Sequence, residues 1–165
     1  MATTYEPIAT ASIGTGGASF TSIPNTYTDL RLVVVAAGDG GTTQLRINLN
    51  NDSNFIYSFT TLSGNGSTAS SARATDNSRW STGLEELPGS STGFGLTILD
   101  LFSYAGSTNK TALWEASGDR NGSGLVVRQV CIYNSTSAIN RIDILATSRN
   151  YASGSTATLY GILKA

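Results

Sequence analysis

The sequence predicts an all-β fold, an antiparallel β-sandwich of roughly eight to ten short strands. Three observations support this prediction. Short runs rich in apolar residues follow one another through most of the chain, with turn-forming residues between them. No window of a dozen residues places apolar side chains at positions i, i+3, i+4 and i+7, as an amphipathic helix requires. The turns are short, and tight turns join antiparallel neighbours, whereas parallel strands need long crossovers.

The predicted strands are spread over the whole chain. The clearest runs are 29–36, 44–49, 94–102, 111–117, 125–133, 139–146 and 155–163, and weaker runs are 5–13, 18–23 and 55–62. In the run 44–49, Leu45, Ile47 and Leu49 alternate with Arg46 and Asn48. This alternation gives a strand with one apolar and one polar face.

Glycine-containing turns separate the predicted strands, at Asp39-Gly40-Gly41, Asn65-Gly66 and Asn121-Gly122. Glycine and asparagine tolerate the positive φ that tight turns need. Each sheet must hide an apolar face, so the strands form either a two-sheet sandwich or a barrel. The 165 residues fit one domain of ordinary size, and we expect residues 1–165 to form a single β-sandwich domain.

The stretch 63–81 differs from its surroundings. It is rich in Ser, Thr, Asn, Ala and Gly, with little apolar surface to bury. We therefore expect a long surface loop over residues 63–81. Long loops without strands or helices of their own are often functional.

Composition excludes several classes of function. Charged residues make up 13% of the chain and its net charge is −1. No basic run indicates nucleic-acid binding, and no apolar run approaches the length of a membrane span. The N-terminus has no basic and then apolar segment, so we expect no signal peptide.

Catalytic and metal-binding patterns are also missing from the sequence. The chain has no histidine and a single cysteine, Cys131, which excludes Ser-His-Asp and Cys-His sites and the usual zinc ligands. No phosphate-binding glycine loop occurs. Glu85 and Glu86 are adjacent, so on a strand they would face opposite ways and on a turn both would be solvated. We expect no enzyme activity, no cofactor and no metal, and we expect Cys131 to lie in the core.

Two short segments are candidate partner contacts. Residues 1–7 have no core of their own, and we expect an extended N-terminal arm that includes Tyr5, Glu6 and Pro7 and gains order by docking on a neighbour. Arg79 and Trp80 follow the polar stretch, and both residue types are frequent at interface hot spots. Trp114, in contrast, lies within a predicted strand and is expected in the core.

Four segments resemble a family of short phage virion proteins, found especially in phages of cyanobacteria and other aquatic bacteria. They are Tyr5-Glu6-Pro7-Ile8-Ala9-Thr10, Ser22-Ile23-Pro24-Asn25-Thr26-Tyr27-Thr28-Asp29-Leu30, Leu62-Ser63-Gly64-Asn65-Gly66-Ser67, and Tyr151-Ala152-Ser153-Gly154-Ser155-Thr156 followed by Leu159-Tyr160-Gly161-Ile162. The resemblance runs from one end of the chain to the other. It implies a jelly-roll-like sandwich on the virion surface. It carries over no catalytic motif and no defined functional residue.

Within a virion, two roles fit this resemblance. The first is a capsid decoration (cement) protein that stabilises the head by binding the major capsid protein, as a homotrimer at three-fold positions. The second is a tail-fibre or tail-tip module that binds a glycan on the host surface. We favour decoration, because the sequence has no coiled-coil stalk and no fibre repeat, and its low charge suits a surface that becomes covered. The expected location is the capsid surface, after synthesis in the host cytoplasm.

Overall fold

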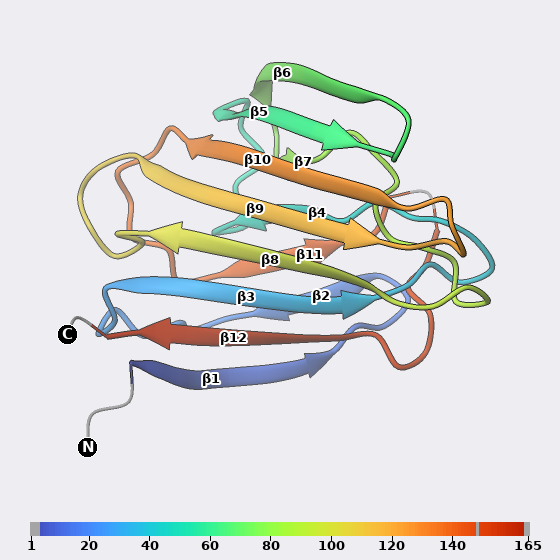
Figure 1. The fold of residues 1–165 in the computed structure, drawn as a ribbon. Coiled ribbons are helices and arrows are strands. Elements are labelled where there is room, and N and C mark those ends of the chain that lie inside the picture. Colours follow the sequence, from blue (N-terminus) through green and yellow to red (C-terminus); the bar gives the residue numbers. More distant parts are fainter. Residues whose placement is uncertain (1–3, 148, 164–165) are drawn as a thin grey trace.

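The computed structural model describes residues 4–147 and 149–163. These residues form twelve strands and no helix, and neighbouring strands pair antiparallel in two sheets. Figure 1 shows the larger sheet in front of the smaller one. The all-β antiparallel sandwich is therefore confirmed, with more strands than the eight to ten expected.

The larger sheet has eight strands and the smaller has four. In spatial order, the larger sheet contains β1 (Tyr5–Ser12), β12 (Thr156–Ile162), β3 (Asp29–Ala36), β8 (Gly95–Phe102), β9 (Lys110–Gly118), β10 (Leu125–Tyr133), β5 (Tyr57–Gly64) and β6 (Ala69–Asn77). The smaller sheet contains β2 (Gly17–Phe20), β11 (Ile142–Leu145), β4 (Arg46–Leu49) and β7 (Trp80–Ser81).

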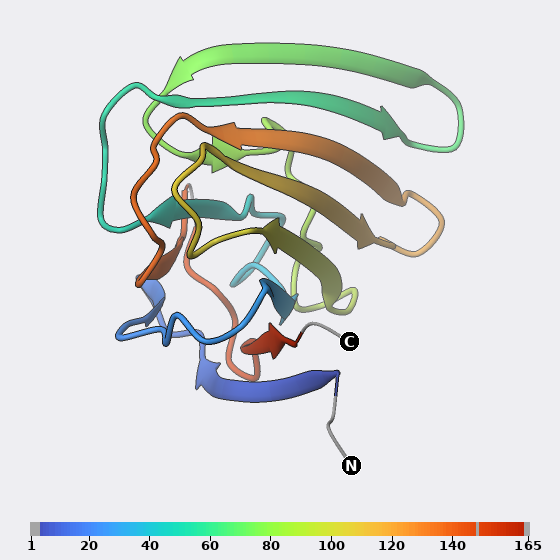
Figure 2. The same cartoon turned by 90° about the vertical axis from the view of Figure 1, so that its left-hand side faces the viewer.

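The topology is that of a jelly roll with two added hairpins. Without the β5–β6 and β9–β10 hairpins, the sheets read β1-β12-β3-β8 and β2-β11-β4-β7. Successive strands then alternate between the two layers, except that β4 and β7 pair within the smaller sheet, and this is the eight-strand order of a jelly roll. The hairpins extend only the larger sheet. In Figure 2 the turns that close them lie at the right, away from the smaller sheet.

Each predicted strand coincides with an observed one. Residues 29–36 and 125–133 match β3 and β10 at both ends, and the run 139–146 contains the shorter β11. The alternation in 44–49 is also observed, because Leu45, Ile47 and Leu49 are fully buried. Sequence analysis missed β6 and β7.

The prediction of a surface loop over residues 63–81 is wrong. β5 continues to Gly64, and β6 returns along it as its antiparallel neighbour. Between them Asn65 closes a tight turn, in which its side-chain oxygen accepts hydrogen bonds from the Ser67 and Thr68 N–H groups (3.1 and 2.8 Å). Nearly all β6 side chains are exposed, since β6 is the last strand of the larger sheet. A strand with both faces in solvent needs no apolar alternation, so its sequence resembles that of a loop.

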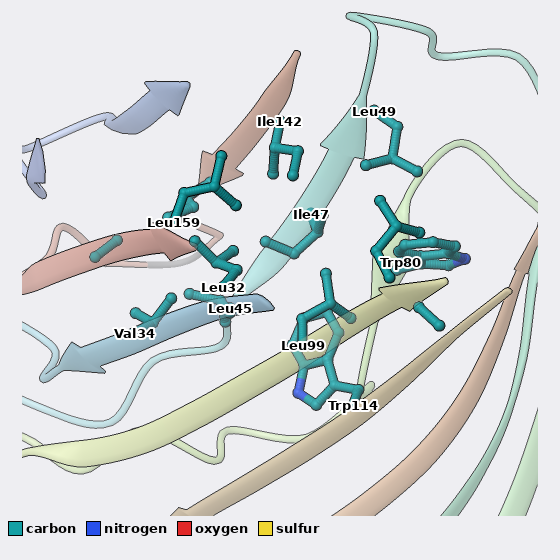
Figure 3. Close-up of a cluster of buried hydrophobic side chains, with 14 of the residues drawn as sticks. Leu32, Val34, Leu45, Ile47, Leu49, Trp80, Leu99, Trp114, Ile142 and Leu159 are labelled. Atoms are coloured by element: carbon teal, nitrogen blue, oxygen red, sulfur yellow. The ribbon is translucent and has the colours of Figure 1, made fainter. Parts of the chain in front are cut away.

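The core lies between the two sheets. Figure 3 shows Leu32, Leu99 and Trp114 of the larger sheet pointing toward Ile47 and other side chains of the smaller sheet. These side chains are at most 1% exposed, and each stabilises the fold by about 1.5–3 kcal/mol through burial. Trp114 and Cys131 are buried as expected.

A close contact between Gly161 and Tyr27 holds the end of β12. A Cβ atom on Gly161 would overlap the Tyr27 ring, so the ring lies directly on the glycine backbone. The Tyr27 hydroxyl donates to Glu6 Oε2 on β1 at 3.2 Å. The ring therefore spans from β12 to β1, and it requires glycine at position 161.

We expect Gly161→Ala to lower the free energy of unfolding by about 1–3 kcal/mol, because the new methyl group must displace the Tyr27 ring. Urea unfolding measures the change. The matched control is Gly16→Ala in the β1–β2 turn, where nothing lies within 4 Å of the added Cβ. That substitution should change the unfolding free energy by no more than about 0.5 kcal/mol. Equal effects of the two substitutions would refute the role of the Gly161–Tyr27 contact.

Candidate interaction surface

The larger sheet exposes a broad apolar surface on the side that faces away from the smaller sheet. We call this side the outer face. Its most exposed apolar side chains lie on four strands and are Val35, Leu62, Leu96, Val126 and Val130. Val126 is 64% exposed and Leu62 59% exposed. Val33, Ile98 and Leu113 stand between them, partly exposed.

Strand pairing arranges the centre of the outer face in rows that cross β8, β9, β10 and β5. The middle row is Ile98, Glu115, Arg128 and Leu62. One flanking row is Leu96, Ser117, Val126 and Gly64, and the other is Asp100, Leu113, Val130 and Thr60. Two opposite charges therefore lie side by side at the centre, with apolar side chains around them.

Ion pairs occupy the charged positions at the centre of the outer face, whereas Arg73 on the edge strand β6 is exposed and forms no ion pair within the described residues. Arg31 donates to both carboxylate oxygens of Asp100, at 2.6 and 2.7 Å, and these bonds raise the pKa of Arg31. The Tyr5 ring lies 5.4 Å from the Arg31 guanidinium carbon. Arg128 pairs with Glu115, and both side chains remain largely exposed. Exposed pairs of this kind add little stability, about 0–1 kcal/mol.

The opposite surface of the sandwich, on the smaller sheet, is polar. Asp143 of β11 lies between Ser19 and Asn48 on the neighbouring strands. It accepts hydrogen bonds from the Ser19 hydroxyl (2.5 Å) and from Arg141 Nε (2.9 Å). The two surfaces thus differ in chemistry, and the apolar one is the stronger candidate for binding a partner.

A groove of about 560 Å³ opens at one end of the outer face. The turns after β5 and β9 form its walls, and the Phe94 ring, 44% exposed, lies against it with Leu96 and Val126. Asn65 and Asp119 contribute polar groups to its lining. An exposed aromatic ring beside polar groups is a chemistry that suits a sugar.

These strands are among those predicted from the sequence, but an uncovered apolar face is not. The available signal is in β10, where Val126 and Val130 alternate with the buried Val127 and Cys131. A strand that covers a core on one side only should be polar on the other. Apolar residues at both the inward-facing and the outward-facing positions of a strand in a two-layer fold therefore indicate an uncovered apolar face.

The expected N-terminal arm is only partly testable, because residues 1–3 lie outside the described structure. Tyr5, Glu6 and Pro7 do not extend from the domain. They belong to β1 and pair with Ile162, Gly161 and Tyr160 of β12. The arm prediction is wrong for these three residues, because the sheet supplies the hydrogen-bonding partners that an arm would seek elsewhere. Tyr5 and Pro7 are nevertheless exposed.

Trp80 is not available as a surface contact. It begins β7, is fully buried, and donates from Nε1 to the Ile132 carbonyl oxygen at 3.0 Å. The Tyr57 ring meets it edge-on at a centroid distance of 5.8 Å. The expectation of an exposed Trp80 is therefore wrong, whereas Arg79 is half-buried. Because β1 and β7 are edge strands of different sheets, the structure does not bring the predicted contacts together.

Glu86 is buried, which excludes the alternative in which both glutamates are solvated on a turn. Its Oε1 accepts from the Leu45 N–H at 3.1 Å and its Oε2 from the Thr82 hydroxyl at 2.7 Å. No cation pairs with it in the described ranges. Burial raises the pKa of Glu86 from 4.5 to about 7. Glu85, next to it, is exposed.

Reactive groups do not converge elsewhere in the part of the chain that the structure describes. That part holds no group of three or more His, Cys, Asp or Glu side chains able to bind a metal ion. Burial raises the pKa of the Cys131 thiol, which disfavours the reactive thiolate. Among residues 4–147 and 149–163, no helix is long and apolar enough to cross a membrane.

Comparison with protein families, curated proteins and solved structures finds no match to this chain. The resemblance to phage virion proteins therefore depends on its four sequence segments alone. The geometry itself offers two means of recognition, burial of the outer face and charge pairing at its centre.

The buried Glu86 makes stability depend on pH. Its folded-state pKa exceeds the unfolded value, so the native state favours the protonated form. Its contribution is fully present below pH 4.5 and is lost as pH rises to about 7. Gln at position 86 stays neutral at every pH. We therefore expect the unfolding free energy of Glu86→Gln, relative to that of the natural chain, to rise by about 1–3 kcal/mol from pH 5 to pH 8.

Urea unfolding of both proteins at the two pH values measures this gain. Glu85→Gln is the control, since the exposed neighbour should show no such pH-dependent difference. A Glu86→Gln effect that is the same at both pH values would contradict the prediction.

Proposed function

We propose that this chain is a bacteriophage virion structural protein, a capsid decoration protein that stabilises the head by binding the major capsid protein. The observation that carries the proposal is the outer face, a wide apolar sheet surface left uncovered in the single chain. The resemblance to short phage virion proteins suggests that the assembly is a phage virion.

Physical chemistry supports an assembly role for this surface. Burial of apolar area stabilises an interface by about 25 cal/mol per Å² before the entropic cost of association is subtracted. The outer face also has few charges to desolvate, and those on its central strands β8, β9 and β10 already form pairs. A partner can therefore cover these strands without leaving an isolated buried charge.

The low charge of the whole chain fits the same role. Charged residues are 13% of the sequence, roughly half of the usual share in soluble proteins. Decoration proteins cover a repeated lattice, where close neighbours require surfaces that do not repel one another. A net charge of −1 satisfies that requirement.

We expect the purified protein to co-sediment with expanded capsids of its own phage and to raise their disruption temperature. A molecule that binds only the assembled state stabilises that state. Mass spectrometry of separated heads and tails should detect the protein in the head fraction. Its recovery with tails alone, or no shift in disruption temperature at saturation, would overturn the proposal.

Val126→Asp tests the outer face directly. Val126 is exposed, so folding should be unaffected, but an unpaired charge on a surface that becomes covered is costly. We expect at least about a tenfold loss of capsid occupancy. Thr15→Asp, in the exposed β1–β2 turn, is the matched control and should bind normally. Equal occupancy of the two variants would exclude the outer face from assembly.

The second candidate function is a tail-fibre or tail-tip module that binds a host glycan. The groove beside Phe94 is the observation that favours it, because sugar rings stack on exposed aromatic rings and exchange hydrogen bonds with groups such as Asn65 and Asp119. A glycan array separates the candidates. Specific binding that is lost in Phe94→Ala would favour the tail module, and a blank array would remove this candidate.

A further inference from the structure

We propose that the outer face packs against the outer face of a second copy of this chain, about a two-fold axis that runs along the boundary between β9 and β10. The inference uses the same outer face that carries the proposed function, but it concerns the free protein in solution, where a second copy covers the surface that the capsid protein would cover on the head. Figure 1 shows the strands concerned, β8, β9, β10 and β5, side by side at the front of the molecule.

The central charges fit this symmetry. Glu115 on β9 pairs in register with Arg128 on β10. A two-fold axis between these strands, in the plane of the interface, places β9 of one copy over β10 of the other. Glu115 then faces Arg128 of the second copy, and Arg128 faces its Glu115. Two intrachain pairs become a ring of four alternating charges, in which each charge has two opposite neighbours.

The apolar side chains fit the same operation. The axis places β8 over β5, so that Ile98 faces Leu62 of the second copy. In the next row Leu113 faces Val130. In the other flanking row Val126 faces Ser117 and Leu96 faces Gly64. Apolar side chains thus meet each other in the middle row and in one flanking row, and small residues oppose them in the third. At the margin the same operation places Asp100 over Thr60 and Arg31 over Arg73 of the second copy, where two hydrogen bonds to Asp100 compensate the charge of Arg31.

Other symmetric arrangements do not give this match. An axis in the interface plane but perpendicular to the strands, passing through the middle row, would place Glu115 over Glu115 and Arg128 over Arg128. Like charges facing each other are destabilising. A trimer would need two different patches, because a two-fold contact uses one patch twice. The self-complementary outer face therefore indicates a dimer in place of the homotrimer expected from the resemblance.

The available area reaches the lower limit for a specific interface, about 1,000 Å² over both partners. With strands about 4.8 Å apart and a rise of about 3.3 Å per residue, four strands of eight or nine residues cover roughly 500 Å² of flat sheet. Standing side chains make the accessible area larger, and a standard interface buries about 800 Å² per partner. Twisted sheets stack face to face in β-sandwiches at about −30°, so the twist seen in Figure 2 is compatible with the contact.

Charge reversal tests the proposal on the purified full chain. Glu115→Arg leaves two positive charges at the centre of each copy, and Arg128→Glu leaves two negative charges. We expect the natural chain to sediment as a dimer and each variant to sediment as a monomer, with a dissociation constant raised at least about tenfold. Both side chains are exposed, so the variants should retain the circular-dichroism spectrum of the natural chain.

An equimolar mixture of the two variants is the decisive measurement. The two positive charges at the centre of the Glu115→Arg variant would face the two negative charges of the Arg128→Glu variant, so the mixture should dimerise although neither variant does so alone. Loss of an intrachain pair alone would not be rescued by mixing. Arg79→Glu, a charge reversal away from the outer face, is the control and should remain dimeric.

A monomeric natural chain, dimeric single variants, or a mixture that stays monomeric would each overturn the proposal. The sedimentation experiment contains no capsid, and capsid binding is measured separately. A dimer that does not bind capsids would therefore contradict the decoration role and leave this inference intact. A natural chain that is monomeric but binds capsids would contradict this inference and leave the decoration role intact.

Discussion

The structure depends on the stacking of two sheets of unequal width. The four strands of the smaller sheet cannot cover the inner side of all eight strands of the larger sheet. The segment from Trp80 to Leu87 fills part of the difference. Trp80 donates to the Ile132 carbonyl of β10, and Gln129 of β10 donates to the Ser81 carbonyl at 3.0 Å. These bonds hold β7 and the segment after it beneath the added hairpins.

The position of this covering segment explains why two of its residues, Trp80 and Glu86, are buried. Trp80 is fully buried at the end of a polar stretch because it lies on β7, the edge strand of the smaller sheet, where its large ring packs beneath β10 and its Nε1 donates to the Ile132 carbonyl oxygen. Glu86 is buried because its carboxylate satisfies the Leu45 N–H, a backbone donor that would otherwise be unpaired in the interior. The raised pKa of Glu86 is a consequence of this position.

The sequence predicts the strands that have one buried face. Short runs of mainly apolar, β-branched residues over Asp29–Ala36 and Leu125–Tyr133 mark β3 and β10 to the residue. β6 gives no such signal, since both of its faces are solvated. The places of Trp80 and Glu86 depend on which sheet is wider, a property of strand pairing over long sequence separations that local patterns do not encode. The outer face could have been predicted from β10, where apolar residues occupy both the inward-facing and the outward-facing positions.

The sheet edges help to explain why association is directed to the outer face. An exposed edge strand can pair with another chain, and proteins prevent this with proline, charge and bulges. β1 has Pro7, which lacks an N–H donor, and its pairing shifts between Pro7 and Ala9. β6 has Arg73 and Asp76, the latter at a φ of 56°, near a pairing shift between β5 and β6. With both edges of the larger sheet modified in this way, addition of strands from other copies is disfavoured. Because edge-to-edge growth has no natural limit whereas a two-fold contact closes on itself, this arrangement favours a finite assembly built through the outer face.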